Sequence, residues 1–123
     1  MRSALGLLAG LLTASAALPA SPLRAQDGAV PFSAVRAVNL ARGTAIARNG
    51  GLGVYRPAQC MYETASAGNQ CLIRSDADGY LFRFLGGAPG WQQTGTAPTT
   101  ETEIRIAPDG RAVVEVLYNS LPR

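Results

Sequence analysis

Residues 79–85, Gly-Tyr-Leu-Phe-Arg-Phe-Leu, decide the fold of this chain. Successive side chains of a β-strand point to opposite faces of the sheet. Tyr80, Phe82 and Phe84 therefore share one face, and Arg83 lies on the other. Three aromatic side chains on one face need a second layer to cover them, and we expect that layer to be a helix.

A helix of suitable composition is predicted upstream, ending at Arg48. Small apolar residues recur there at the spacing of one helical face, namely Ala34, Val38, Ala41 and Ala45. Small side chains allow the helix to approach a sheet closely. We expect Ser33 to cap the first turn, with Phe32 packed against it as a hydrophobic staple. Asn49-Gly50-Gly51 is expected to end the helix.

The segments that precede residues 79–85 are predicted as short extended pieces, at residues 54–56 and 72–74. Asp76-Ala77-Asp78-Gly79 is typical of a tight turn between strands. The same four residues resemble part of a calcium-binding loop. However, Arg74 and Leu85 stand where that loop needs its first and last acidic ligands. We therefore interpret the four residues as a turn and predict no metal site.

A second hairpin is predicted after a long loop of Gly, Pro, Thr and Gln at residues 86–98. Residues 100–107 alternate, with Ile104 and Ile106 on one face, and residues 112–118 return as a strand. Both isoleucines are expected to face the core.

The register of this hairpin depends on its turn. A three-residue loop with Gly110 in the left-handed conformation would place Ile106 opposite Ala112, which brings apolar residues together. It would also place Glu103 opposite Glu115, and this pair is unfavourable unless an arginine lies between the two carboxylates.

A helix followed by strands predicts an α+β domain. We expect one N-terminal helix packed on an antiparallel meander of about four strands, with one disulfide. Residues 26–123 would form this single small domain, because 98 residues suit one core and leave no room for two. The polar residues 63–69 are expected to be exposed.

Residues 1–25 have the layout of a secretory signal peptide, with Arg2, an apolar run from Ala4 to Leu18 and a small-residue exit. Cleavage is predicted after Ala25, with Ala20 as a second site. An uncleaved anchor is the alternative, although the apolar run is short for a membrane span. The prediction is export to the periplasm or the medium, with no stable membrane span after cleavage.

The net charge of +3 overstates the charge of the predicted mature domain. Arg2 and Arg24 leave with the signal peptide, so nine arginines remain against eight acidic residues. These arginines are spread along the chain rather than clustered. Nucleic-acid binding is therefore not predicted.

Cys60 and Cys71 are the only cysteines. Two cysteines this close in an exported protein typically form a structural disulfide. A reactive thiol pair is the alternative, but the spacing is not Cys-x-x-Cys, and no helix start nearby would activate a thiol.

The chain contains no His and no Lys. The usual general base near neutral pH, the usual zinc ligand and lysine nucleophiles are therefore excluded, and no cofactor is predicted. Carboxylates remain as candidates, because Glu101, Glu103 and Glu115 are expected on the solvent face of the second hairpin. The simpler interpretation is a charged, solvated sheet face.

The most suggestive segment for binding is residues 86–93, Gly-Gly-Ala-Pro-Gly-Trp-Gln-Gln. Binding residues often lie on loops of a rigid scaffold. Trp91 could anchor a partner, framed by Pro89 and followed by the hydrogen-bonding amides of Gln92 and Gln93. In the alternative, the indole folds back over the core and its N–H donates to a backbone carbonyl.

Four segments resemble small exported proteins of cyanobacterial type that have no assigned activity. They are residues 49–56 (Asn-Gly-Gly-Leu-Gly-Val-Tyr-Arg), Cys60-Met61, Cys71-Leu72 and residues 82–92 (Phe-Arg-Phe-Leu-Gly-Gly-Ala-Pro-Gly-Trp-Gln). The resemblance covers most of residues 36–119 and implies export and a single domain, without any catalytic residue. In outline, a helix before an antiparallel meander also resembles the cystatin architecture, but the inhibitory Gln-x-Val-x-Gly loop is absent.

The leading hypothesis is a non-enzymatic exported binding or interaction module that contacts an envelope protein or a glycan through residues 86–93. A carboxylate-dependent hydrolase is the first alternative. An envelope structural component that associates through an exposed sheet edge is the second.

Overall fold

The computed structural model describes Gly10 and residues 30–123. Apart from Gly10, the predicted signal peptide lies outside the described residues, as do both predicted cleavage sites. In chain order, the elements are α1 (Phe32–Arg48), β1 (Arg56–Pro57), η2 (Gln59–Tyr62), β2 (Leu72–Asp76), β3 (Gly79–Gly87), α2 (Trp91–Thr94), β4 (Thr100–Ile106) and β5 (Val113–Ser120).

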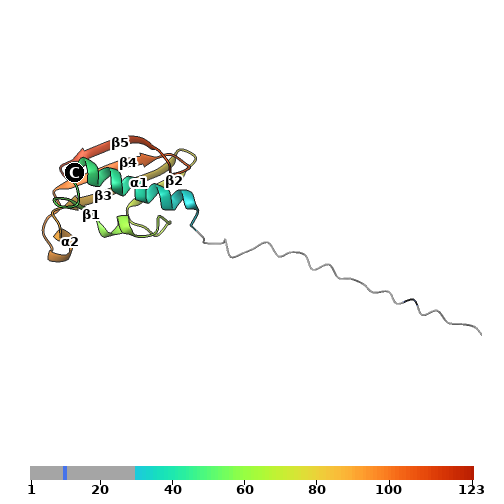
Figure 1. Ribbon diagram of the computed structural model, residues 1–123, viewed down its shortest axis with the longest axis horizontal. Coiled ribbons are helices and arrows are strands. Elements are labelled where there is room, and N and C mark those ends of the chain that lie inside the picture. Colours follow the sequence, from blue (N-terminus) through green and yellow to red (C-terminus); the bar gives the residue numbers. More distant parts are fainter. Residues whose placement is uncertain (1–9, 11–29) are drawn as a thin grey trace, which may run out of the picture.

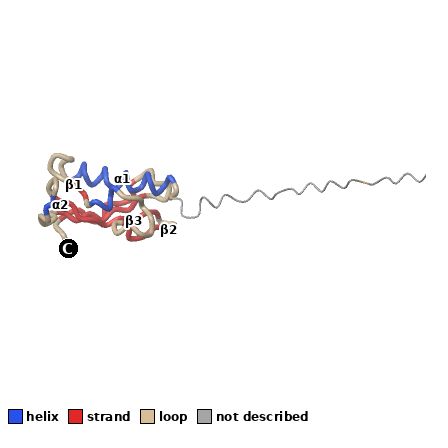
Figure 2. The backbone as a smooth tube through the Cα atoms, turned by 90° about the horizontal axis from the view of Figure 1, so that it is seen from below, coloured by secondary structure: helices blue, strands red, loops and turns tan. Residues whose placement is uncertain are grey.

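The fold has two layers, a helix and an antiparallel sheet, which Figure 2 shows one above the other. α1 runs across one face of the sheet (Figure 1). β4 pairs with one edge of β3, β1 and β2 pair with the other, and β5 extends the sheet beyond β4. The predicted α+β class is confirmed. The sheet has five strands rather than about four, because Arg56 and Pro57 pair with Gly87 and Gly86.

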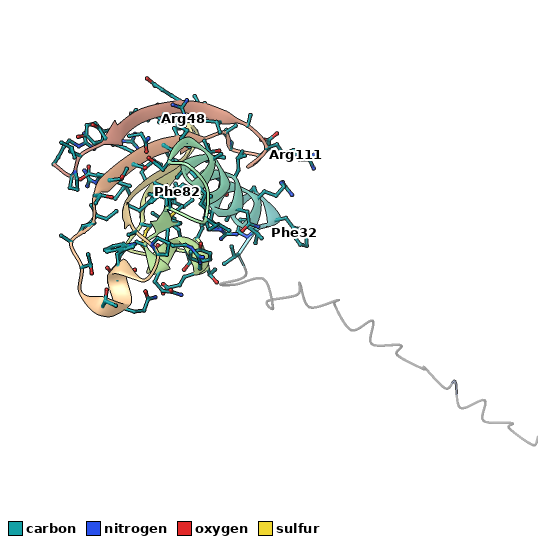
Figure 3. The ribbon with its side chains drawn as sticks, turned by 60° about the vertical axis from the view of Figure 1, so that its left-hand side comes forward. Phe32, Arg48, Phe82 and Arg111 are labelled. Carbon is teal, nitrogen blue, oxygen red and sulfur yellow. A yellow bond between two sulfur atoms is a disulfide. The ribbon has the colours of Figure 1, made fainter. Side chains whose placement is uncertain are left out.

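Small side chains of the helix meet large side chains of the sheet in the core. α1 buries Ala34, Ala37, Val38, Ala41 and Ala45. The sheet buries Tyr80, Phe82, Phe84, Ile104 and Ile106 against them. Figure 3 shows Phe82 between the helix and the sheet. Both predicted core faces are confirmed, and the small helical residues bring the two backbones close enough to exclude water.

The start of α1 differs from the prediction. The helix begins at Phe32, directly after Pro31, and no side chain caps it. The Ser33 hydroxyl lies 2.7 Å from the Tyr80 hydroxyl, so it joins the helix to β3 instead of capping. Phe32 is 82% exposed and points outward (Figure 3), so the predicted staple is wrong. A proline at this point already fixes the backbone for helix entry.

The end of α1 is as predicted. Asn49 follows the last helical residue, and the Gly51 N–H donates to the Ile46 carbonyl at 2.9 Å. This bond satisfies one of the carbonyls that a helix end leaves without a partner.

The turn between β2 and β3 is confirmed, because Asp76 pairs with Gly79 across a two-residue loop. The Asp76 carboxylate accepts the Asp78 N–H at 2.9 Å and forms an ion pair with Arg74 at 3.0 Å. The carboxylate therefore supports the turn, which is the role expected of an aspartate at this position.

The predicted register of the second hairpin is wrong. Ile106 pairs with Val113 rather than with Ala112. Two register shifts follow along β5, and they leave Val114 and Leu117 without an opposite residue on β4. Extra residues of this kind are β-bulges, and alternation in one strand gives no sign of them.

The bulges remove the expected carboxylate clash. Glu115 lies opposite Arg105, and Glu103 lies opposite Tyr118. Opposite charges across neighbouring strands stabilise a sheet, whereas like charges destabilise it. The observed register therefore has more favourable electrostatic pairing across the two strands than the predicted register.

Gly110 is left-handed as predicted, with φ 76°. A side chain there would overlap the Ser33 carbonyl and the Arg36 side chain. The Arg36 guanidinium donates to the Asp109 carbonyl from Nε at 3.0 Å and from a terminal nitrogen at 2.8 Å. The turn thus packs closely on the first turns of α1.

Cys60 and Cys71 form the predicted disulfide, with 5.8 Å between their Cα atoms. Disulfides persist mainly outside the reducing cytoplasm, so the bond is typical of a non-cytoplasmic environment. No helix in the part of the chain that the structure describes is both long and apolar enough to cross a membrane.

Within the loop closed by the disulfide, residues 63–69 are exposed as predicted except at Ala65 and Asn69. The Asn69 amide donates to the carbonyls of Cys60 and Thr64 at 2.8 and 3.0 Å. Its oxygen accepts the Cys71 N–H at 2.8 Å. Asn69 is buried because it organises the backbone on both sides of the bridge.

Candidate binding site

Trp91 begins α2, a single helical turn after β3. The backbone N–H of Trp91 donates to the Ala88 carbonyl at 3.0 Å, so residues 88–91 form a tight turn. The indole packs directly over Gly87, where an added Cβ would lie 3.0 Å from the ring. The end of β3 therefore places the tryptophan against the sheet.

Trp91 is only 8% exposed, and its indole N–H donates to the Arg56 carbonyl at 2.8 Å. The prediction of Trp91 as an anchor that reaches into a partner is therefore wrong, because the ring is already packed and its N–H is already bonded. The fold-back alternative describes the geometry. The indole joins α2 to β1 across 35 residues of sequence.

The segment around Trp91 nevertheless forms part of a concave surface. A pocket of about 290 Å³ lies between residues 56–62 and residues 90–93. We call it the amide pocket, and it is lined by Arg56, Pro57, Gln59, Tyr62, Gly90, Trp91, Gln92 and Gln93. Gln92 and Gln93, both predicted as binding residues, are brought together here. Pro89, the fourth predicted residue, is exposed and does not line the pocket.

One wall of the amide pocket is fixed by a second long-range hydrogen bond. The Gln92 side-chain oxygen accepts the Gln59 N–H at 2.8 Å. The oxygen is thus engaged within the protein, and the NH₂ group of the same amide remains to donate a hydrogen bond to a ligand. Gln93 and Arg56 are exposed beside it.

Arg56 is the one charged residue among those that line the amide pocket. Its Nε donates to the Leu52 carbonyl at 2.9 Å, and no ion pair involves it within the described residues. The backbone therefore orients the guanidinium while its terminal nitrogens have no carboxylate partner.

Tyr62 lines both the amide pocket and a smaller pocket of about 200 Å³, and it is 47% exposed. The Arg42 guanidinium lies 4.7 Å from the centre of the Tyr62 ring and donates to the Met61 carbonyl at 2.8 Å. This contact attaches η2 to α1 and places the Arg42 cation over the Tyr62 ring.

Sequence reasoning missed Arg56, Gln59 and Tyr62 as pocket residues. They lie next to Cys60 in the sequence, in a segment with no binding motif of its own. Nothing in their spacing shows that residues 90–93 will lie against them. The available signal was chemical, an arginine and an amide beside an aromatic residue in a segment stabilised by a disulfide.

The three candidate carboxylates do not form one site. Glu101 and Glu103 share Arg123, whose guanidinium lies 2.6 Å from one and 3.0 Å from the other. Glu115 lies opposite Arg105 and is exposed. Burial raises the pKa of the Glu101 carboxyl, but the hydrogen bonds and charge of Arg123, with the charge of Arg83, outweigh burial and bring the pKa below its ordinary value. Glu101 is thus held as a carboxylate, which does not suit a proton donor, and the hydrolase alternative gains no support.

The buried phenol of Tyr55 offers no catalytic group either. Burial raises its pKa to about 12. Its hydroxyl lies over Gly86, where any side chain would overlap the ring. Tyr55 is a neutral packing residue that depends on a glycine at position 86.

β5 forms one free edge of the sheet, where exposed Val114 and Leu117 stand at the two bulges. The short strands β1 and β2 form the other edge, and β2 also carries a register shift. Bulges and irregular register reduce the tendency of an edge to pair with another chain. The edge-association alternative therefore also gains no support.

A larger groove of about 520 Å³ lies at the other end of the helix, between the start of α1 and β2. It is lined mainly by apolar side chains, among them Val30, Ala34, Leu72 and Tyr80. None of the predicted binding residues lines this groove.

Within the described residues, no group of three or more His, Cys, Asp or Glu side chains is arranged to hold a metal ion. No known protein family, curated protein or solved structure shows significant similarity to the chain. The resemblance to exported proteins of cyanobacterial type stays a prediction.

Proposed function

We propose that the protein is an exported, non-enzymatic binding module that holds a polar ligand in the amide pocket. The observation that carries the proposal is the construction of this pocket. Two segments more than 30 residues apart are joined by the bonds from Trp91 to Arg56 and from Gln59 to Gln92. Exposed polar side chains of both segments then line one concave surface.

The chemistry of the lining favours binding over catalysis. The residues that line the amide pocket carry glutamine amides, an arginine and a tyrosine, but no carboxylate or thiol. These groups donate and accept hydrogen bonds, and fixed polar groups of this kind orient a ligand in a preformed site.

The disulfide supports export and rigidity together. It closes the loop that carries Tyr62 and that begins directly after Gln59. A cross-link lowers the entropy of the unfolded chain, and a wall that is already ordered loses less freedom when a ligand binds. Such a wall suits a binding module of an oxidising compartment, where its partner would be a glycan or an envelope protein.

The proposal is tested by probing an immobilised glycan and peptide array with the purified domain. Gln93→Ala removes an exposed amide of the pocket, and Gln70→Ala removes an exposed amide outside it. We expect specific binding that Gln93→Ala weakens and Gln70→Ala leaves unchanged. Binding that is insensitive to Gln93→Ala and to Gln59→Ala would contradict the proposal.

A further inference from the structure

We infer that the ligand of the amide pocket is an acidic saccharide, with a carboxylate that binds the Arg56 guanidinium. The inference rests on the proposed function and names the class of ligand at that same site.

The charge of the pocket favours an anionic ligand. Arg56 is the one ionised group among the lining residues, and no acidic residue faces it from the other wall. A planar guanidinium matches a carboxylate with two parallel hydrogen bonds. The ion pairs of the described residues join other arginines to Asp76, Glu101 and Glu103, and Arg56 takes part in none of them. Its charge remains available to a ligand.

The hydrogen bonds of the pocket residues also favour an anion. The bond from the Arg56 Nε to the Leu52 carbonyl leaves the terminal nitrogens as the free donors. Gln92 lines the same pocket, and with its oxygen occupied by the Gln59 backbone N–H, its NH₂ group is a further donor there. Several donors in one pocket favour an oxygen-rich anion.

The backbone of the β1 wall favours a saccharide over an extended peptide. An extended peptide binds by adding a strand to a free sheet edge. β1 has only two residues, and Pro57 has no N–H. The Arg56 carbonyl and the Gln59 N–H are already bonded to Trp91 and Gln92. This wall therefore offers few backbone groups for a strand, whereas its side chains offer what hydroxyls and carboxylates need.

The size of the pocket sets how much of the ligand is enclosed. A volume of about 290 Å³ lies near the lower end of the usual range for ligand sites. The pocket therefore suits one acidic sugar unit of a longer chain, with its neighbours outside near Tyr62.

The inference is tested by titrating the ¹⁵N-labelled domain with three probes. These are tri-galacturonate, its fully methyl-esterified form and tri-glutamate. The indole N–H of Trp91 reports on the site directly, because it donates to the carbonyl of Arg56. We expect saturable shifts of that signal with tri-galacturonate, and binding that weakens as salt is added.

Two matched variants make the result specific. Arg56→Gln should weaken tri-galacturonate binding by about tenfold or more, as expected for a lost charge-assisted hydrogen bond. Arg111→Gln removes the same charge at the end of the molecule remote from α2 (Figure 3) and should leave the affinity unchanged.

The outcomes separate the inference from the proposed function. Equal binding of the methyl ester, with no effect of Arg56→Gln, would overturn the acidic ligand and leave the pocket as a binding site. Equal binding of tri-glutamate would overturn the saccharide. If tri-galacturonate and its ester both fail to shift pocket signals, the inference is overturned and the proposed function loses saccharides as ligands.

Discussion

The helix-covered core and the amide pocket are built by different means. In the core, alanines of α1 meet aromatic and isoleucine side chains of the sheet, and burial of apolar surface is the dominant stabilising term. Around the pocket, two hydrogen bonds between distant segments and the Cys60–Cys71 disulfide set the geometry. The first region keeps the chain folded, and the second presents polar groups that contribute little to folding.

Phe82→Ala should produce the largest loss of stability, because Phe82 is fully enclosed between α1 and the sheet. Truncation of a core phenylalanine costs about 3–5 kcal/mol, which is a large part of the stability of a small domain. Urea unfolding followed by circular dichroism measures the change. Leu85→Ala is the control, because Leu85 lies on the same strand but is 36% exposed. A cost for Phe82→Ala similar to that of Leu85→Ala would show that the described core is wrong.

Replacement of Cys60 and Cys71 together by alanine should cost about 2–3 kcal/mol, because the short loop is no longer closed in the unfolded chain. The domain should remain folded, since most of the buried apolar side chains belong to α1, β3 and β4 rather than to the bridge. Thermal unfolding with and without reductant measures the effect, and the double variant should not respond to reductant. An unchanged melting temperature would mean that the bridge does not constrain the segment.

Trp91→Phe tests the joint between α2 and β1. Phenylalanine keeps an aromatic ring over Gly87 but cannot donate to the Arg56 carbonyl. We expect a loss of about 1 kcal/mol, the net value of one hydrogen bond, in a urea titration. The free energy of ligand binding should fall by more than the free energy of unfolding, because the two walls of the pocket lose the hydrogen bond that joins them. If stability falls and binding does not, the joint has no role in the site.

The contact between Arg123 and Glu101 should give the smallest effect, visible only in acid. The folded-state pKa of Glu101 lies below its ordinary value of 4.5. Its contribution is therefore complete above that value and is lost as the pH falls through the lower folded-state pKa. Glu101→Gln should flatten this part of the stability profile between neutral pH and acid. An identical profile in wild type and variant would contradict the pairing.

The core could be predicted because its signals are local. The alternation of Tyr80, Phe82 and Phe84 and the helical spacing of the alanines each depend on residues a few positions apart. Both faces were found where the sequence placed them. By contrast, alternation places Leu81 on the same face as Arg83, away from α1, yet it is only 8% exposed. The arginines at positions 74 and 105 pair across from it, and their aliphatic stems can cover it.

The candidate site could be predicted only in part, because it depends on contacts between distant segments. Gln92 and Gln93 were found from their own loop, while Arg56, Gln59 and Tyr62 were not. The bond from Trp91 to Arg56 spans 35 residues and leaves no periodic pattern in the sequence. The same limit explains the wrong register of β5, where two bulges follow from packing rather than from alternation.

Fluorescence of the single tryptophan tests most directly whether the pocket is built on a packed indole. The account predicts blue-shifted emission from the ligand-free domain and weak quenching by acrylamide. In urea, the emission should shift to the red and the quenching should rise to the values of an exposed indole. Emission and quenching like those of free indole in the native domain would contradict the account, because the two walls of the pocket would then not be joined.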